Sequence, residues 1–96
     1  MNTRNPSRGQ PTILVVENEI SNRILIERVL STRGYHCLTA SNGREALEIL
    51  DQERVDLILT DLSMPVLDGY RTTQLIRARP EMANVPIVAV TAYCFE

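Results

Sequence analysis

Acidic side chains follow two strongly apolar runs of this chain, at the points where the runs stop. Asp61 directly follows residues 55–60, and the acidic stretch 17–19 directly follows residues 12–16. If the two runs form neighbouring parallel strands, their carboxyl ends meet at one edge of a sheet, which is where open α/β sheets bind ligands. We therefore expect Asp61 and residues 17–19 to share one oxygen-rich pocket.

A pocket of this kind has the ligands that magnesium prefers. Mg²⁺ takes oxygen ligands, uses one or two carboxylates and keeps several of its waters. Crowded carboxylates are costly when all are charged, and a bound cation relieves that cost. Glu17, Asn18 and Asp61 are therefore candidate ligands. The alternative interpretation is that they are solvated charges in surface turns.

Another polar side chain falls where a further apolar run stops. Thr91 follows residues 87–90, and its hydroxyl is placed to donate a hydrogen bond to a phosphoryl oxygen in the same crevice. The alternative is that it bonds to nearby backbone groups. His36 lies within a different run, away from the acidic residues, and we assign it no catalytic role. The chain contains neither a G-x-S-x-G nor a G-x-G-x-x-G motif.

Size and charge exclude several classes of function. The 96 residues suit one small globular domain, and a net charge of −2 without a basic stripe argues against direct binding to nucleic acid. No apolar stretch approaches the ~20 residues that span a bilayer. Residues 1–10 lack the apolar core of a secretory signal, and we expect them to be a disordered lead-in. We expect a cytoplasmic protein in which Cys37 and Cys94 are reduced thiols.

The elements that must position these residues alternate between strands and helices. Continuous apolar character predicts buried strands at residues 12–16, 55–60 and 87–90, and residues 35–40 suit an edge strand. Strands separated by helices, without hairpin signals, favour right-handed βαβ units and a parallel sheet. The expected helices run from Ser21 or Asn22 to Gly34, from Asn42 with Glu45 completing a capping box, and from Asp68, as the cap of residues 69–78, to Pro80.

Several motifs, taken together and in this order, resemble the receiver domains of response regulators in two-component and phosphorelay signalling. They are Val15-Val16-Glu17-Asn18-Glu19, Asn42-Gly43-Arg44-Glu45-Ala46-Leu47, Thr60-Asp61-Leu62-Ser63-Met64-Pro65, Leu67-Asp68-Gly69 and Pro86-Ile87-Val88-Ala89-Val90-Thr91-Ala92. Residues 18–23 look most similar to receivers attached to hybrid histidine kinases.

The resemblance implies a mechanism. Asp61 would be the phosphoacceptor, taking a phosphoryl group from a phosphohistidine on a histidine kinase or a histidine phosphotransfer domain. Mg²⁺ would be held by Asp61, Asn18 and the backbone carbonyl of Ser63, with Glu17 acting directly or through water. Thr91 would contact the phosphoryl group as a switch element. Such a domain is a phosphoprotein rather than an enzyme in the ordinary sense, since it takes part only in its own phosphoryl transfer.

The chain departs from the family's pattern in two ways. Receivers usually carry two acidic residues after the first strand, and here the second position is Asn18, so metal affinity should fall. The resemblance also stops after four strands and three helices, without the fifth strand and its phosphate-pairing lysine. Residues 87–90 would then form an open edge, and the helix over residues 21–33 would lose a neighbour and expose apolar surface.

The expected fold is therefore α/β, a flavodoxin-like doubly wound parallel sheet that is incomplete, with strand order 2-1-3-4, and residues 11–96 form a partial receiver domain. The favoured function is that of a phosphoacceptor. The alternative is a non-phosphorylated, truncated receiver that binds partners or forms a homodimer through the exposed edge of the fourth strand. A metal-dependent phosphohydrolase is disfavoured, because no second Asp follows Asp61 at short spacing.

Overall fold

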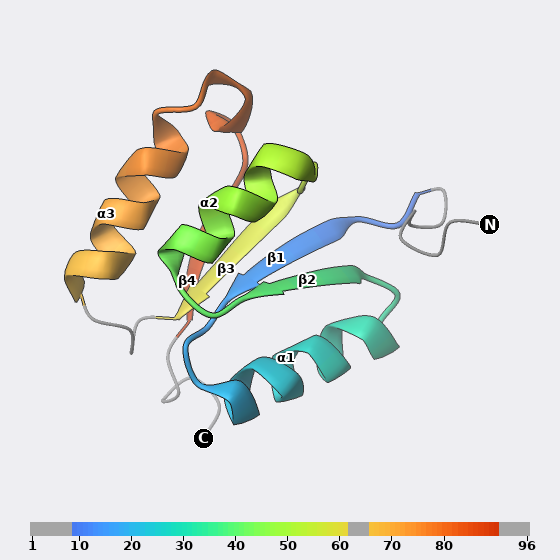
Figure 1. Ribbon diagram of the computed structural model, residues 1–96. Helices are drawn as coiled ribbons and strands as arrows, with labels where there is room; N and C mark the ends of the chain where they lie inside the picture. The colour runs from blue at the N-terminus through green and yellow to red at the C-terminus, as the bar shows by residue number, and fades with distance from the viewer. Residues whose placement is uncertain (1–8, 62–65, 91–96) are drawn as a thin grey trace.

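One parallel sheet organises the protein. The computed structural model describes residues 9–61 and 66–90, with only the backbone at residues 61, 66–70, 89 and 90. The strands lie in the order β2-β1-β3-β4, all parallel (Figure 1). They are β1 (Thr12–Val16), β2 (His36–Ala40), β3 (Leu57–Asp61) and β4 (Ile87–Val90). The expected parallel sheet and its strand order are confirmed, as is the place of the 35–40 run at an edge.

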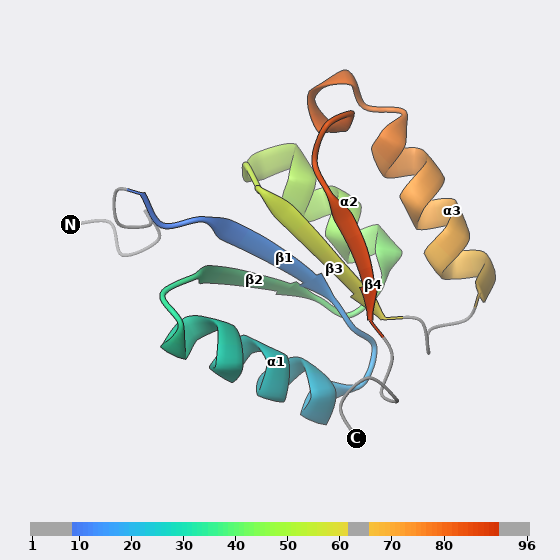
Figure 2. The same cartoon turned by 180° about the vertical axis from the view of Figure 1, so that it is seen from behind.

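Three helices connect the strands, with a short 3-10 turn before the last one. They are α1 (Ile20–Thr32), α2 (Gly43–Gln52), α3 (Val66–Arg77) and the turn η1 (Pro80–Met82). In Figure 1, α2 and α3 lie beside each other on one side of the sheet, and α1 lies along the β2 edge. Figure 2 shows that no helix covers β3 and β4 on the opposite face in the described part of the chain.

The main hydrophobic core lies between the sheet and α2 with α3. Alternate residues of the central strand, Leu14 and Val16, pack there with Ala46 of α2 and Ile76 of α3, and each is at most 1% exposed. All five residues of β1 are buried, which matches its unbroken apolar run. Because side chains alternate between the two faces of a strand, Ile13 and Val15 lie on the other face, toward α1. Both faces of β1 are thus covered.

The helix α1 is covered much less than α2. None of its residues is buried, and four large apolar side chains are 46–62% exposed: Ile20, Ile24, Leu25 and Val29. The partly buried residues Ile26 and Leu30 alternate with these at helical spacing. The expected exposure of apolar surface on this helix is therefore confirmed.

The helix starts differ in part from the sequence-based expectations. The side chain of Asn42 accepts a hydrogen bond from the Glu45 backbone N–H at 2.9 Å, so the predicted cap of α2 is confirmed. The Glu45 carboxylate reaches back to Ser41 instead of to Asn42, accepting from the Ser41 N–H and hydroxyl at 2.7 Å each. The capping box is therefore displaced by one residue toward the N-terminus.

The predicted caps of the other two helices are wrong. The cap of α1 is Glu19, without a side-chain cap hydrogen bond, and Ser21 and Asn22 lie inside the helix. The Ser21 hydroxyl donates to the Glu19 carboxylate at 2.6 Å and is thus engaged outside the helix backbone. Asp68 also lies inside a helix, since α3 begins at Val66. The expected end of α1 holds, because Gly34 follows it with a φ of 91°, a conformation that glycine adopts readily.

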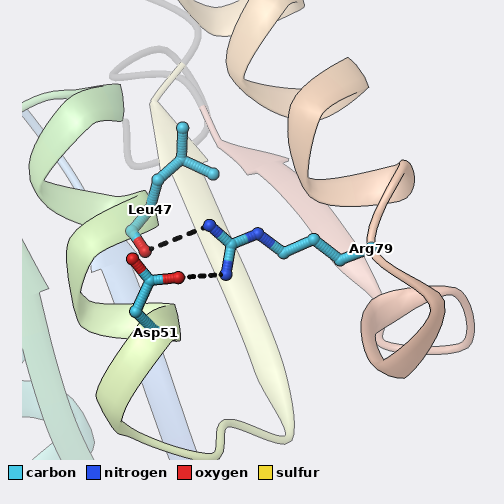
Figure 3. Close-up of polar contacts among 3 residues, drawn as sticks. All are labelled: Leu47, Asp51 and Arg79. Carbon is cyan, nitrogen blue, oxygen red and sulfur yellow. Dashed lines mark hydrogen bonds and ion pairs between the residues drawn. The ribbon is translucent and has the colours of Figure 1, made fainter.

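Two arginines fix the crossover from α3 to β4. The Arg77 guanidinium donates to three backbone carbonyls of the crossover, those of Met82, Ala83 and Val85, at 3.2, 3.2 and 2.7 Å. The Arg79 guanidinium reaches α2, where it bonds the Asp51 carboxylate at 2.7 Å and the Leu47 carbonyl at 3.5 Å (Figure 3). Asp51 is 60% exposed, so the ion pair itself contributes little, on the order of 0–1 kcal/mol. Its main effect is to set where the crossover lies.

The first residue of α2 is where the two helices on this face come closest. A Cβ atom placed on Gly43 would overlap the Thr72 side chain of α3, with the Thr72 Cβ 3.0 Å away and Cγ2 3.2 Å away. The glycine is needed here for close approach, because its backbone conformation is an ordinary one for other residues. The separation of α2 from α3 therefore depends on this position having no side chain.

We predict that Gly43→Ala lowers the free energy of unfolding by about 1–3 kcal/mol, because the new methyl group overpacks the contact with Thr72. Urea unfolding followed by circular dichroism measures this. The control is a double-mutant cycle with Thr72→Ala, which removes the hydroxyl and methyl groups that clash. The double variant should be more stable than the sum of the two single changes implies. Strictly additive losses would show that the contact is not the cause.

Candidate functional site

Parallel pairing brings the two acidic strand ends together. In the register of β1 with β3, Val16 lies opposite Thr60, so the next residues, Glu17 and Asp61, occupy adjacent positions where the strands end. Asp61 itself pairs with Val90, the last residue of β4. Figure 1 shows the carboxyl ends of β1, β3 and β4 converging at one edge of the sheet. The predicted neighbourhood of Asp61 and the 17–19 stretch thus exists at the level of the backbone.

Among the side chains that the structure describes at this edge, that of Glu17 is the most buried charged one. It is 2% exposed, and its Oε2 accepts a hydrogen bond from the Glu19 backbone N–H at 2.9 Å. Its own N–H donates to the Ala40 carbonyl at 2.9 Å, which extends the pairing of β1 with β2 by one residue. A carboxylate buried at a strand end and partnered by backbone is held in place rather than free in solvent. This favours a built site over a solvated turn.

The two residues after Glu17 differ from it in burial. Asn18 and Glu19 are exposed, although Glu19 is engaged by the Ser21 hydroxyl. Because Asn18 is exposed, its side chain is open to solvent at the end of β1. Glu19 is the N-cap residue of α1, and its carboxylate bonds Ser21 of that helix while its backbone N–H bonds Glu17. The acidic stretch therefore supplies one buried carboxylate and one accessible amide.

Part of the predicted site lies outside the described residues. This holds for Ser63 and Thr91, and for Cys94, and only the backbone of Asp61 is described. Among the described side chains, no group of three or more His, Cys, Asp or Glu residues is close enough to hold a metal ion. The predicted ligand set of Glu17, Asn18, Asp61 and Ser63 accordingly stays a prediction, as does the contact of Thr91.

The loop after β2 reaches the same edge and carries its own charge. Glu45 has its pKa lowered, first by the hydrogen bond from the Ser41 backbone N–H, then by the one from the Ser41 hydroxyl, and further by the positive charge of Arg23. Arg23 in turn donates from Nη1 to the Glu17 carbonyl at 2.8 Å. Sequence reasoning missed Arg23. The only signal for it was a positive side chain in the first turn of a helix, where cations are unfavourable.

The two remaining residues considered for chemistry lie elsewhere on β2. His36 begins that strand, half-buried, at the end of the sheet opposite to Glu17, and its N–H donates to the Pro11 carbonyl at 2.9 Å. Next to it, Cys37 is half-buried, and burial, with a smaller effect from Glu27, raises the pKa of its thiol to about 11. A thiol of this kind is almost wholly protonated near neutral pH and unreactive.

Comparison with known proteins identifies the family. A model of the response regulator receiver domain matches residues 13–94. The chain is 44% identical over 86 residues to the sensor histidine kinase RcsC of Salmonella typhimurium, covering 90% of this chain and 9% of the kinase. It is 45% identical over 80 residues to the probable transcriptional regulator ycf27 of Porphyra purpurea, covering 83% of this chain and 32% of that protein.

Solved structures agree with this match. The receiver domain of the sensor histidine kinase PA1611 from Pseudomonas aeruginosa, crystallised with a magnesium ion coordinated in its active-site cleft, superposes with a TM-score of 0.79 at 38% identity, covering 92% of this chain and 72% of that one. The chemotaxis response regulator CheY4 of Vibrio cholerae gives a TM-score of 0.78 at 32% identity, covering 83% and 67%.

These matches, with the strand order and the acidic edge, place the chain in the response regulator receiver domain family of two-component signalling. The predicted flavodoxin-like fold, with four strands in the order 2-1-3-4 and three helices, is confirmed. The chain spans only a small part of the kinases and about a third of the regulators that it matches. None of the described helices is long and apolar enough to cross a membrane.

Proposed function

We propose that the chain accepts a phosphoryl group on Asp61 from a phosphohistidine of a histidine kinase or a histidine phosphotransfer domain, with Mg²⁺ as its cofactor. One observation carries this proposal. The β1–β3 register sets the end of β3, at Asp61, beside the buried carboxylate of Glu17, in a chain of the receiver family. The receiver domain of PA1611, with magnesium in its cleft, supports the choice of metal.

The donor set of this edge fits magnesium. Glu17 offers a buried carboxylate and Asn18 an exposed amide oxygen, and oxygen ligands of this kind, with waters retained, are what Mg²⁺ takes. Asp61 and the carbonyl of Ser63 would complete the set. When bound, the ion would neutralise charge on the phosphoryl oxygens, which is the main need of phosphoryl transfer.

The chain's own residues would do the rest. A carboxylate oxygen of Asp61 forms a bond to phosphorus while the bond from phosphorus to the donor's imidazole nitrogen breaks, and the imidazole keeps that electron pair. The product is an acyl phosphate on Asp61. Glu17 positions the acceptor side of the site through its fixed place at the end of β1. Thr91, one residue beyond the end of β4, would donate its hydroxyl hydrogen bond to a phosphoryl oxygen.

We predict that wild-type protein gains one phosphoryl group when incubated with acetyl phosphate and Mg²⁺, as measured by intact mass and Phos-tag gel, and that Asp61→Asn gains none. The matched control is Asp56→Asn at the opposite end of β3, where an amide oxygen can still accept the Thr12 N–H. This variant should be labelled like wild type. An unlabelled wild type, or an equal adduct in Asp61→Asn, would count against Asp61 as the acceptor.

We predict that Asn18→Asp binds Mg²⁺ about 10-fold more tightly than wild type, because a second negative charge is added next to Glu17 at an exposed position. Amide chemical shifts followed during a Mg²⁺ titration give the Kd. Asn84→Asp adds the same charge at an exposed position before β4 and should leave the Kd unchanged. If both variants shift the Kd equally, the effect is one of net charge and Asn18 is not at the ion.

We infer a second function, a protein-interaction module that pairs with a second copy of itself. The specific observation is the open outer edge of β4, which has no strand beyond it in the described part of the sheet. Val88 on this strand is 44% exposed. An identical edge can pair with itself antiparallel across a two-fold axis, so that each copy closes the other's edge.

We predict that light scattering at increasing concentration detects a dimer and that Val88→Lys shifts it to monomer, because a lysine on an edge strand opposes strand pairing. The control is Tyr35→Lys, which places the same charge on another exposed apolar residue, just before β2 at the opposite edge of the sheet. This control should still form the dimer. A wild type that stays monomeric throughout, with a cooperative melt, would rule out association through this edge.

A further inference from the structure

Arg23 joins helix α1 to the acidic end of β1. Its Nη1 donates to the backbone carbonyl of Glu17 at 2.8 Å, and its own backbone N–H bonds the carbonyl of Glu19 at 3.0 Å. We propose that Arg23 is a positioning residue, which holds Glu17 and the 17–19 loop in the arrangement that receives the magnesium ion. The inference rests on the function proposed above and adds a residue that does not itself contact the ion.

Within its own helix Arg23 is four residues from Glu19 and from Glu27, a spacing at which opposite charges contribute about 0.2–0.5 kcal/mol per pair. Its guanidinium nevertheless bonds the Glu17 carbonyl, outside that helix. Arg23 lies in the first turn of α1, where the helix dipole is positive and a cation is unfavourable by a few tenths of a kcal/mol or more. That helix has no acidic residue in its first turn and no side-chain hydrogen bond at its cap. The long side chain is nevertheless half-buried and directed back onto the loop before the helix. What it gains there is a charge-assisted hydrogen bond to the Glu17 carbonyl.

With this contact, each backbone polar group of Glu17 and one of its carboxylate oxygens has a fixed partner. The Glu17 N–H is held by the Ala40 carbonyl, the Glu17 carbonyl by Arg23 and Oε2 by the Glu19 N–H. A loop ordered before the metal arrives does not lose that conformational freedom when the metal binds. Without the Arg23 contact, the 17–19 loop would have to become ordered when Mg²⁺ binds, and the entropy lost in that ordering would weaken Mg²⁺ binding.

The positive charge of Arg23 also reaches the neighbouring loop. It is one of the causes that lower the pKa of Glu45, after the two hydrogen bonds from Ser41. Arg23 thus bonds the loop after β1 and also acts on a carboxylate in the first turn of α2. The loops that follow β1 and β2 lie at the edge of the sheet where β3 ends (Figure 1). A cation beside these loops would be expected to repel Mg²⁺ if charge were its only effect.

The two explanations therefore predict opposite changes in Mg²⁺ affinity when the Arg23 charge is removed. If Arg23 acts only through its charge, then Arg23→Gln removes a repulsion and Mg²⁺ binds more tightly. If Arg23 positions the loop, the same change weakens Mg²⁺ binding, and we expect about a 10-fold higher Kd, as is common when a residue that supports metal ligands is removed. Arg23→Lys keeps the charge and one donor but not the planar fork, so its loss should be smaller.

The test is a Mg²⁺ titration of the metal-free proteins by amide chemical shifts, together with amide hydrogen exchange without metal. Arg28→Gln is the matched control, because it removes the same charge from an exposed position on the same helix. We expect Arg23→Gln alone to raise the Kd and to speed exchange at the Glu19 amide, while amides of the central strand β1, such as Leu14, stay protected in both variants. A Kd in Arg23→Gln equal to or below that of wild type overturns the inference.

Failure of the inference is distinguishable from failure of the proposed function. A wild type that binds Mg²⁺ but gains no adduct on Asp61 contradicts phosphoacceptance and leaves the positioning role intact, since the Kd and exchange results do not require phosphorylation. A wild type that shows no Mg²⁺ binding at Glu17 and Asn18 overturns both. Normal phosphorylation in wild type with equal Kd values for Arg23→Gln and Arg28→Gln overturns the positioning role alone.

Discussion

The parallel pairing of β1 with both of its neighbours is the constraint on which the rest of the structure depends. Every side chain is described in two strands, β1 and β2, and of these only β1 is buried throughout. It pairs in register with β2 on one side and with β3 on the other. Because all strands run in the same direction, their carboxyl ends lie at the same edge of the sheet. Glu17, Ala40 and Asp61 meet there for this reason, and not because any local motif draws them together.

The two faces of this sheet are built with unequal strength. On one face, α2 and α3 enclose the main core, and Arg79 of the crossover after α3 bonds Asp51 and the Leu47 carbonyl of α2. On the other, α1 covers Ile13 and Val15 but leaves its own outer side apolar and exposed. Arg23 is therefore notable as a polar connection on the weaker face, between α1 and the end of β1. The edge of the sheet with Glu17 is thus supported by side-chain packing on the face of α2 and α3, and by the hydrogen bond of Arg23 on the face of α1.

Much of this could be predicted from sequence, because the strands are short apolar runs separated by helical patterns. The run at residues 87–90 corresponds to β4 without a shift, and the prediction that the first and third strands end side by side is confirmed. The helix caps were less predictable. Ser and Asn are preferred at caps in general, but α1 begins at Ile20, before either is reached, and α3 begins at Val66, two residues before Asp68.

The contact of Arg23 with Glu17 could not be predicted in the same way. It joins a side chain to a backbone carbonyl across a loop whose shape is set by burial of the Glu17 carboxylate and by the pairing of its N–H with Ala40. No periodic pattern of apolar residues in the sequence indicates such a contact. The same is true of the close approach of Gly43 to Thr72, which depends on how two helices far apart in the sequence cross the sheet.

The absence of any hairpin among the described strands has a consequence for how the chain folds. Each strand pair joins segments separated by a whole helix, so none can form from neighbouring residues alone. The longest closure is the one that the site needs, between β1 and β3, where the Thr12 N–H bonds a carboxylate 44 residues away. Loop-closure entropy must be lost before those contacts repay it, which makes such topologies slow relative to helical bundles. The edge that sets Glu17 beside the end of β3 can therefore exist only after β1 and β3 have paired.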